Sequence, residues 1–263
     1  MKIGLIGLSN SGKTTIFNAL TQATAAVSAY TNSRAEPNLA IVDVGDQRVG
    51  RLSKIYQPKK TVYATIELVD FVGVAGGNGN GNAFSNEFMH IIKNMDALAI
   101  VLRNFKDDFM GESDPHADWN ELFTELLLAD LITVENRLER IQTGYQRGVR
   151  STMLQFEERT LRRILNQLNQ NQPILKMDFT EDEYKIIKGF QFLTLKPMLI
   201  ILNSAESNFG QNQHFINAID KNGHIDVIEF GTEKSIREKG RFRLEGKDYP
   251  VQDGNILSFR FNV

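Results

Sequence analysis

The sequence predicts an α/β protein with a mostly parallel sheet and an antiparallel pair of long helices inserted into the chain. Three observations lead to this fold class. The chain opens with a short apolar run, a glycine-rich loop and a stretch of helical spacing, which is typical of a strand–loop–helix unit. Two later apolar runs each end in a polar motif. In parallel sheets the ligand-binding residues lie at the carboxyl ends of the strands, so these runs are typical of such strands. Between those two runs, apolar residues recur at alternating spacings of four and three, the pattern of packed helices.

The composition is that of an ordinary globular protein and excludes several kinds of function. The 263 residues suffice for one large domain or two small ones, and the formal net charge of −2 provides no global basic field for nucleic acid. The chain has no cysteine, which excludes disulfides and thiolate metal sites, and its four histidines form no close pair for zinc. No segment reads as a signal peptide or a membrane span, so we expect a cytoplasmic protein.

The first twenty residues predict a phosphate-binding loop. Ile3 to Ile6 is a short apolar run typical of a buried strand, and residues 7–14 then match the motif G-x-x-x-x-G-K-[ST] in full. Ile16, Phe17 and Leu20 follow at helical spacing. Such a loop curls so that its backbone N–H groups point at a phosphate, and the helix N-terminus adds its dipole. The alternative is a glycine-rich turn that matches by chance.

We expect this loop to hold a nucleoside triphosphate together with Mg²⁺. Lys13 would bridge the β- and γ-phosphates, and we expect its side chain to face the solvent and not the core. The Thr14 hydroxyl would ligate Mg²⁺. The candidate phosphate-binding residues are Gly7, Asn10, Ser11, Gly12, Lys13, Thr14 and Thr15.

A second phosphate-side motif ends the predicted strand over residues 61–69. Residues 70–73 read Asp-Phe-Val-Gly, a match to D-x-x-G. Asp70 would hold Mg²⁺ through water, and the Gly73 N–H would bond the γ-phosphate and sense its hydrolysis. Lys13, Asp70 and Gly73 are therefore the candidate catalytic residues. Val74 stands where many GTPases place a glutamine that orients the attacking water, and valine cannot hydrogen-bond.

A third motif, at the end of the apolar run 199–202, predicts which base is read. A guanine-reading protein has Asn, Lys, any residue and Asp here, but this chain has Ser204 for the lysine and Glu206 for the aspartate. The longer glutamate moves its carboxylate off the position that accepts two guanine donors. Asn203 can instead meet N6–H₂ and N7 of adenine. ATP is thus favoured over GTP; the alternative is that Asn203 only caps the strand and the base is held loosely.

Residues 119–191 predict a helical arm. An apolar seam of four-three spacing in the first helix returns in a second helix after a glycine-bearing turn, and Pro173 and a Thr180 N-cap end the arm. The seam consists of Leu127, Leu131, Val134, Leu138 and Ile141, with Leu154, Leu161, Leu165 and Leu168 on the return.

Seven arginines give this arm a basic character. They are Arg137, Arg140, Arg147, Arg150, Arg159, Arg162 and Arg163. Two interpretations are open: a solvated helix face, or a patch that contacts RNA phosphates.

With these motifs in order, the chain is similar to the YchF group of Obg-related P-loop NTPases, also called Obg-like ATPases. The similarity is carried by "NSGKTTIFNALT", "AEPNLAIVDVGDQRVGRLSKIYQPKK", "VDFVG", "TELLLADLITVENRLERI", "FLTLKPMLIILNSAE" and "GRFRLEGKDYPVQDGNILSFRFNV". The resemblance implies a Ras-like G domain at 1–118 and 192–224, a coiled-coil arm at 119–191, and a TGS-like segment at 225–263. It also implies hydrolysis of ATP in preference to GTP, and a link to ribosomes.

The chain departs from the family pattern in two places. Arg34 replaces the switch threonine that would complete the Mg²⁺ shell, which with Val74 favours low basal turnover or, alternatively, a nucleotide-dependent binding module with negligible hydrolysis. The second departure is length, because the chain reaches the TGS ending without most of the TGS sheet. Residues 225–263 are then either a remnant of that domain, or "HIDVIEF" forms a strand that completes the G-domain sheet with the last two strands as a hairpin.

Overall fold

The structure is a computed structural model that describes residues 1–21, 37–71, 86–107, 111–219 and 226–230. The chain divides into two compact units. The sheet unit comprises residues 1–75, 95–118 and 198–263, and the helical unit comprises residues 76–94 and 119–197.

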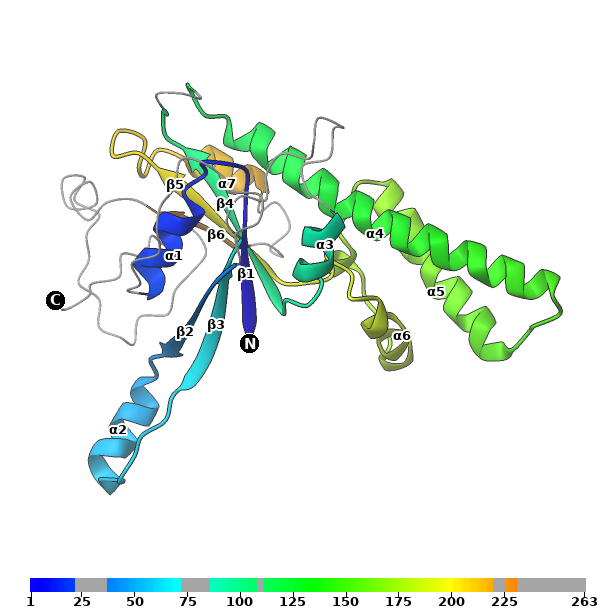
Figure 1. Ribbon diagram of the computed structural model, residues 1–263, viewed down its shortest axis with the longest axis horizontal. Helices are drawn as coiled ribbons and strands as arrows, with labels where there is room; N and C mark the ends of the chain where they lie inside the picture. The colour runs from blue at the N-terminus through cyan, green and yellow to red at the C-terminus, as the bar shows by residue number, and fades with distance from the viewer. Residues whose placement is uncertain (22–36, 72–85, 108–110, 220–225, 231–263) are drawn as a thin grey trace. The chain divides into compact units, whose positions relative to one another are not determined.

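The sheet unit contains a six-stranded sheet with the order β2-β3-β1-β4-β5-β6 (Figure 1). Only the β2–β3 pair is antiparallel, which confirms the predicted mostly parallel sheet. The strands are β1 (Lys2–Ile6), β2 (Asn38–Val44), β3 (Ala64–Asp70), β4 (Ala97–Asn104), β5 (Met198–Ser204) and β6 (Asp226–Phe230).

Strand β4 lies in the middle of this sheet and is buried along its whole length. A parallel strand covered on both faces reads as a continuous apolar run, which is why "ALAIVL" does not alternate. On one face the helix α1 (Lys13–Thr21) packs through Ile16 and Phe17. The other helices of this unit are α2 (Gln47–Tyr56) and α7 (Gln213–Ile219).

The parallel register brings several strand ends to one edge of the sheet. Leu5 lies opposite Asp70, and Asn104 lies opposite Ser204. The motifs that follow β1, β3 and β5 are far apart in sequence but share this carboxyl edge, where ligands bind in open parallel sheets.

The strand within "HIDVIEF" completes the sheet of this unit. Strand β6 pairs with β5 in parallel, from Leu199 opposite Asp226 to Asn203 opposite Phe230. This agrees with the strand expected in the second of the two arrangements that the sequence leaves open, while the hairpin expected after it lies outside the described residues. Residues 231–263 lie outside the described part of the chain, so a TGS-like segment there stays a prediction.

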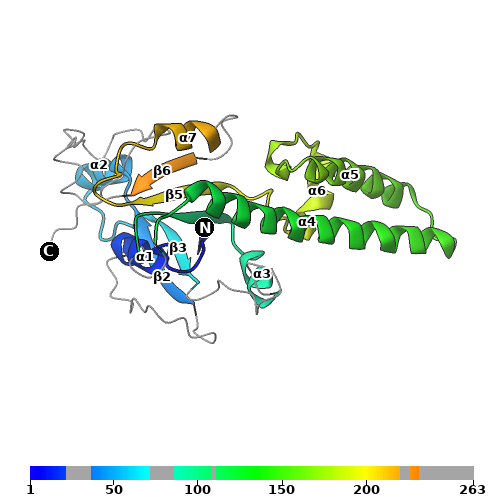
Figure 2. The same cartoon turned by 90° about the horizontal axis from the view of Figure 1, so that it is seen from above.

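The helical unit is built around two long antiparallel helices, α4 (Pro115–Gln146) and α5 (Thr152–Asn169), which lie side by side in Figures 1 and 2. We call this pair the helical hairpin. Gly148 takes the left-handed conformation in the turn (φ 81°), and the Ser151 hydroxyl caps α5 by accepting from the Leu154 N–H. The remaining helices of the unit are α3 (Asn86–Ile92), η1 (Ile174–Lys176), α6 (Glu181–Ile187) and η2 (Lys188–Phe190).

The interior of the helical hairpin follows the predicted apolar seam, with one shift. Six of the nine predicted seam residues are buried: Leu127, Val134, Leu138, Ile141, Leu161 and Leu168. Leu131, Leu154 and Leu165 are only partly buried against them. Ile164, which the prediction left out, is fully buried. The register of α5 turns Ile164 inward because the helix buries a stripe wider than one strict seam.

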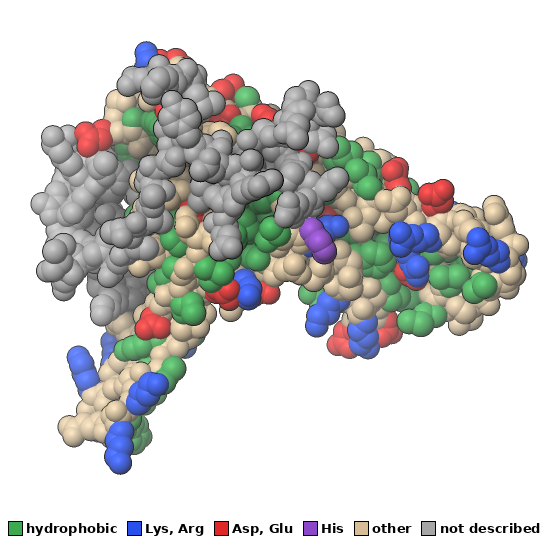
Figure 3. All heavy atoms as spheres, viewed as in Figure 1, with side chains coloured by type: hydrophobic (Ala, Val, Ile, Leu, Met, Phe, Trp, Pro, Cys, Tyr) green, Lys and Arg blue, Asp and Glu red, His purple; other side chains and the backbone are tan. Residues whose placement is uncertain are grey.

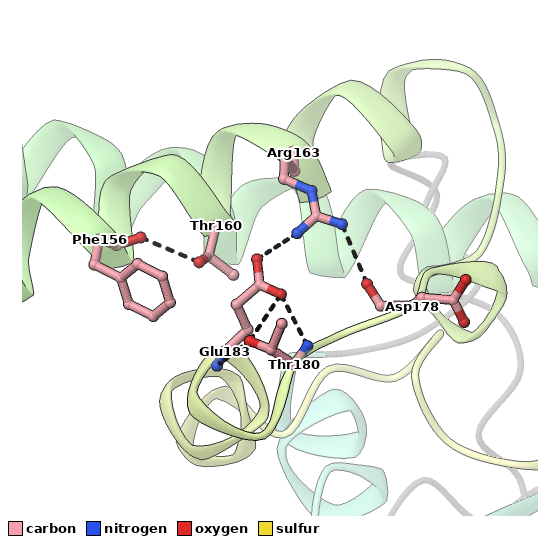
Figure 4. Close-up of polar contacts among 6 residues, drawn as sticks. All are labelled: Phe156, Thr160, Arg163, Asp178, Thr180 and Glu183. Atoms are coloured by element: carbon pink, nitrogen blue, oxygen red, sulfur yellow. Dashed lines mark hydrogen bonds and ion pairs between the residues drawn. The ribbon is translucent and has the colours of Figure 1, made fainter.

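Ion pairs tie this unit together on its surface. Arg137 binds Glu157 across the helical hairpin with an N–O distance of 2.7 Å, and Arg162 pairs with Glu158 on α5. Thr180 caps α6 as predicted and forms a capping box with Glu183, whose carboxylate also pairs with Arg163 (Figure 4). None of the described helices is long and apolar enough to cross a membrane.

One fully buried acid joins the helical hairpin to the segment that leads back to the sheet. The Asp130 carboxylate, at 0% exposure, accepts the backbone N–H groups of Leu193 and Thr194 at 2.8 and 2.7 Å. It also accepts the Thr194 hydroxyl at 2.7 Å. Burial raises the pKa of Asp130 to about 6, although these donors and the charge of Lys93 offset part of that shift.

We predict that Asp130 makes the stability of the protein depend on pH between about 4 and 6. The folded carboxyl keeps its proton up to pH about 6, whereas the unfolded chain releases it near 3.8. The contribution of this group to the free energy of unfolding is therefore full below pH 3.8 and is lost as pH rises through 6, by at most about 3 kcal/mol. Urea unfolding gives the free energy of unfolding of the wild type and of Asp130→Asn at each pH from 4 to 7.5. Because asparagine does not titrate, the difference between the two proteins reports the contribution of Asp130.

The stability difference between these two proteins should shrink as pH rises. Asp182→Asn, at an exposed acid of α6, is the matched control and should follow the wild-type curve. Parallel curves for the wild type and Asp130→Asn would contradict the prediction.

Candidate functional site

The candidate site is the loop between β1 and α1, at the carboxyl edge of the sheet. A side-chain Cβ at Gly7 would lie 2.4 Å from the Val101 carbonyl oxygen, and one at Gly12 would lie 2.1 Å from Nδ2 of Asn203. Gly12 also has a φ of +89°, which disfavours any side chain. Both motif glycines are thus required by close packing. Asn10 is also in the left-handed region, with φ 59°, which asparagine tolerates.

Lys13 lies inside this loop, and the expectation of a solvent-facing side chain is wrong. The side chain is buried, and its ammonium donates to the carbonyl oxygens of Gly7 at 3.0 Å and Leu8 at 2.8 Å. The curled backbone of the loop thus supplies the carbonyl acceptors that bind the Lys13 ammonium group. Burial lowers the pKa of Lys13 to about 8, and the negative charge of Asp70 offsets part of that shift.

The two predicted Mg²⁺ residues meet at the end of β3. The Thr14 hydroxyl donates to Oδ2 of Asp70 at 2.8 Å, and Asp70 is completely buried. Its other oxygen, Oδ1, and the hydroxyl of Ser11 have no hydrogen-bond partner within the described residues. A buried carboxylate oxygen without a donor is costly unless a cation or its bound water satisfies it. The residues present therefore fit a Mg²⁺ ion.

The protein offers few ligands of its own at this position. In the described part of the chain, no group of three His, Cys, Asp or Glu side chains is arranged to hold a metal ion. That donor set suits Mg²⁺, which keeps several waters and takes one or two protein oxygens together with phosphate oxygens.

Two asparagines at this edge were not singled out from the sequence. Asn38 donates from Nδ2 to Oδ2 of Asp70 at 3.3 Å, and Asn104 donates to the Ser204 hydroxyl at 2.8 Å. Asn104 could have been found, because it is a polar residue at the end of a strand that begins with six apolar residues. Asn38 could not, because β2 is half exposed and shows no such contrast.

The predicted base motif lies against the phosphate loop. Nδ2 of Asn203 donates to the Ser11 carbonyl oxygen at 3.0 Å, so one amide hydrogen serves the loop. The Ser204 side chain is buried with Asn104, which leaves its backbone as the part able to face a base. Glu206 is exposed at the start of the following loop.

The remaining predicted site residues are distributed as follows. Thr15 is exposed in the first turn of α1. Gly73, Val74 and Arg34 lie outside the described residues. The structure thus brings together Ser11, Gly12, Lys13, Thr14, Asp70 and Asn203.

Comparison with known sequences agrees with this geometry. Residues 2–137 match the family described as "50S ribosome-binding GTPase", and residues 211–262 match the C-terminal family of YchF GTPases, described as "Protein of unknown function (DUF933)". The "Ribosome-binding ATPase YchF" of Pasteurella multocida is 28% identical over 362 residues, covering 100% of this chain and 99% of that protein. The protein of the same name from Bacillus subtilis is 35% identical over 207 residues, covering 77% and 56%.

A solved structure shares the fold. The YchF GTPase of Schizosaccharomyces pombe superposes with a TM-score of 0.73 at 28% identity, covering 93% of this chain and 68% of that one. The alignment of 362 residues with the Pasteurella protein is longer than the 263 residues of this chain, so the relative carries segments that this chain lacks. The phosphate loop, the Thr14–Asp70 pair and these matches together place the chain in the YchF family of P-loop nucleotide-binding proteins, in a shortened form.

Proposed function

We propose that this protein binds ATP with Mg²⁺ in preference to GTP and hydrolyses it slowly. The observation that carries the proposal is the contact of Thr14 with the buried Asp70, whose second oxygen has no donor within the described residues. Thr14 and Asp70 would hold Mg²⁺, which would supply positive charge to the β- and γ-phosphate oxygens. Lys13 would exchange the loop carbonyls for phosphate oxygens, and the Gly73 N–H would sense the γ-phosphate.

The preference for adenine rests on the base motif. The names of the relatives differ on the nucleotide, since the bacterial proteins are called ATPases and the yeast protein a GTPase. In this chain the lysine of the guanine motif is replaced by the buried Ser204, and Glu206 is one methylene too long for paired contacts with guanine. Asn203 keeps Oδ1 and its second amide hydrogen for the N6–H₂ and N7 of adenine.

A nucleotide-dependent binding module with negligible turnover is the second candidate. Two residues favour this candidate. Arg34 places a cation where the family has a switch threonine that reaches Mg²⁺, and Val74 cannot hydrogen-bond to the attacking water. Single-turnover hydrolysis at saturating ATP distinguishes this candidate from a slow ATPase.

We propose a ribosome or RNA contact, in the cytoplasm, through the tip of the helical hairpin. The bacterial relatives are named for ribosome binding. Three of the arm arginines, Arg137, Arg162 and Arg163, are already paired with acids of the arm. Arg147 and Arg150 are exposed in the turn, and Figure 3 shows basic side chains along the helical hairpin with acidic ones beside several of them. The RNA-contacting arginines would thus be those of the turn.

We also propose the division expected from the sequence: a G domain at 1–118 and 192–224, an arm at 119–191 and a C-terminal segment at 225–263. The separation of the sheet unit from the helical unit near residue 118 supports the first boundary. The strand β6 argues that the C-terminal segment contributes to the G-domain sheet.

We predict that ATP binds more tightly than GTP and that Glu206→Asp narrows the difference. The shorter side chain returns the carboxylate to the position that accepts both guanine donors, and Glu206 is exposed, so the change should not disturb folding. A shift in relative affinity of roughly tenfold is expected for one bidentate contact. Competition against a fluorescent nucleotide measures it. GTP binding more tightly to the wild type by tenfold or more would overturn the proposed base preference.

We predict that ATP affinity falls as pH rises above about 8. Lys13 must be charged to bind phosphates, and its pKa in the free loop is about 8. Above that value binding takes up one proton, so affinity should fall by up to about tenfold per pH unit. Titrations between pH 7 and 9.5 measure this, with Lys13→Arg as the control because a guanidinium stays charged. An unchanged affinity for the wild type across that range would show that Lys13 does not bind the phosphates as an ammonium.

We predict that the arm turn binds RNA weakly, with a steep loss as salt rises. Each arginine–phosphate contact releases condensed counterions, so the salt dependence reports the number of contacts. Arg147→Glu with Arg150→Glu should abolish binding at low salt in an RNA mobility assay. Lys59→Glu with Lys60→Glu, at exposed positions of the sheet unit, makes the same change in net charge and should leave binding in place. Equal effects of the two double variants would remove the arm from the interaction.

A further inference from the structure

The first residue of β2 contacts the acid that ends β3. Asn38 lies directly opposite Asp70 in the antiparallel pair of these strands, and residues that are paired in this way have their side chains on the same face of the sheet. Nδ2 of Asn38 donates to Oδ2 of Asp70 at 3.3 Å. Because an ionised carboxylate can only accept hydrogen bonds, the amide nitrogen is the end of the Asn38 side chain that faces Asp70. The strand pairing thus brings a neutral donor to the carboxylate that is proposed to hold Mg²⁺.

The hydrogen bonds of the Asp70 carboxylate are unevenly distributed. Oδ2 accepts from Asn38 and also from the Thr14 hydroxyl, at 2.8 Å. Oδ1 is buried and has no hydrogen-bond partner in the described part of the chain. Compensation of a buried charge does not account for this distribution, because a donor placed only for that purpose would serve the oxygen that lacks one. The second donor on Oδ2 therefore has a role beyond compensation.

Two donors on one oxygen restrict how the carboxylate can turn. The terminal torsion of an aspartate is broad, so a carboxylate held by one hydrogen bond can rotate and exchange its two oxygens. Thr14 belongs to α1 and Asn38 to β2, so two elements of the sheet unit hold Oδ2. Oδ1 is then the oxygen that is available to a cation or to its bound water. The Thr14 hydroxyl gives its hydrogen to Asp70, and its oxygen keeps lone pairs for a metal ion.

We propose that Asn38 is a positioning residue for the Mg²⁺ site. It prevents rotation of the Asp70 carboxylate, so that Oδ2 stays with Thr14 and Oδ1 stays available to the ion or its water. Asn38 itself binds neither the ion nor the nucleotide. The inference rests on the proposed binding of Mg²⁺ by Thr14 and Asp70, and it adds the residue that orders these two side chains. Replacing a residue that orients a metal ligand through a hydrogen bond typically lowers metal affinity by roughly 10- to 100-fold.

The test measures how strongly Mg²⁺ increases the nucleotide affinity of the full chain. The dissociation constant of a fluorescent, non-hydrolysable ATP analogue is determined in EDTA and in excess Mg²⁺, for the wild type and for Asn38→Ala. The ratio of the constant in EDTA to the constant in Mg²⁺ reports the contribution of the ion. This ratio should fall by roughly tenfold in Asn38→Ala. The constant in EDTA should stay close to that of the wild type, because Asn38 acts only through the ion.

A merely compensating role for Asn38 predicts the opposite sign. Removing a donor from a buried carboxylate leaves its negative charge less stabilised and more attractive to a cation, so the ratio would stay the same or rise. Asn38→Leu has nearly the same shape without the donor, and it should show the same fall as Asn38→Ala. If Asn38→Ala does not fold, as judged by its melting temperature, the ratio in Asn38→Leu decides the question.

Asn94→Ala is the matched control. Nδ2 of Asn94 also donates at 3.3 Å, to the His90 carbonyl oxygen, but this asparagine is exposed and belongs to the helical unit. Its ratio should equal that of the wild type, and a fall as large as that of Asn38→Ala would overturn the inference. An unchanged or raised ratio in a folded Asn38 variant, when the wild type responds to Mg²⁺, overturns this inference alone. A wild type whose nucleotide affinity does not respond to Mg²⁺ overturns the proposed Mg²⁺ site, and this inference with it.

Discussion

A single buried carboxylate organises the phosphate end of this protein. Asp70 ends a strand in the interior of the sheet, where the parallel register sets it opposite the end of β1. There it accepts from Thr14 of α1 and from Asn38 of β2, so three elements converge on one side chain. A full negative charge at zero exposure needs compensation. The hydroxyl, the amide and the nearby Lys13 ammonium provide part of it, and the proposed Mg²⁺ ion would supply the rest.

The fold and the phosphate loop could be predicted because they follow local rules. A strand, a glycine-rich loop and a helix in succession can be recognised from about twenty consecutive residues. The two packed helices reveal themselves by the spacing of apolar residues such as Val134, Leu138 and Ile141, all of which are buried. Pro173 restricts the backbone, and the Thr180 side chain caps the helix that begins one residue later. Each of these signals lies within one short stretch of the sequence.

The rest depends on contacts between distant segments. Asn104 and Ser204 are 100 residues apart, and Asn203 and Ser11 are 192 apart. No spacing rule reports such pairs. The burial of Lys13 was missed for a related reason: a lysine in a loop is usually solvated, and only the curled backbone shows that carbonyl acceptors are within reach. The inward turn of Ile164 reflects a helix face wider than the strict seam.

The contact of Asn203 with the phosphate loop restricts how the proposed base preference could change. Its amide lies so close to Gly12 that no side chain fits between them, and it also donates to the Ser11 carbonyl. A replacement at Asn203 would therefore disturb the cradle for the phosphates as well as the base. The Ser204 side chain is bonded instead to Asn104, and the Glu206 side chain is exposed. Under the proposed base reading, selection would change at Ser204 and Glu206 while the asparagine stays, and these are the positions where this chain differs from the guanine motif.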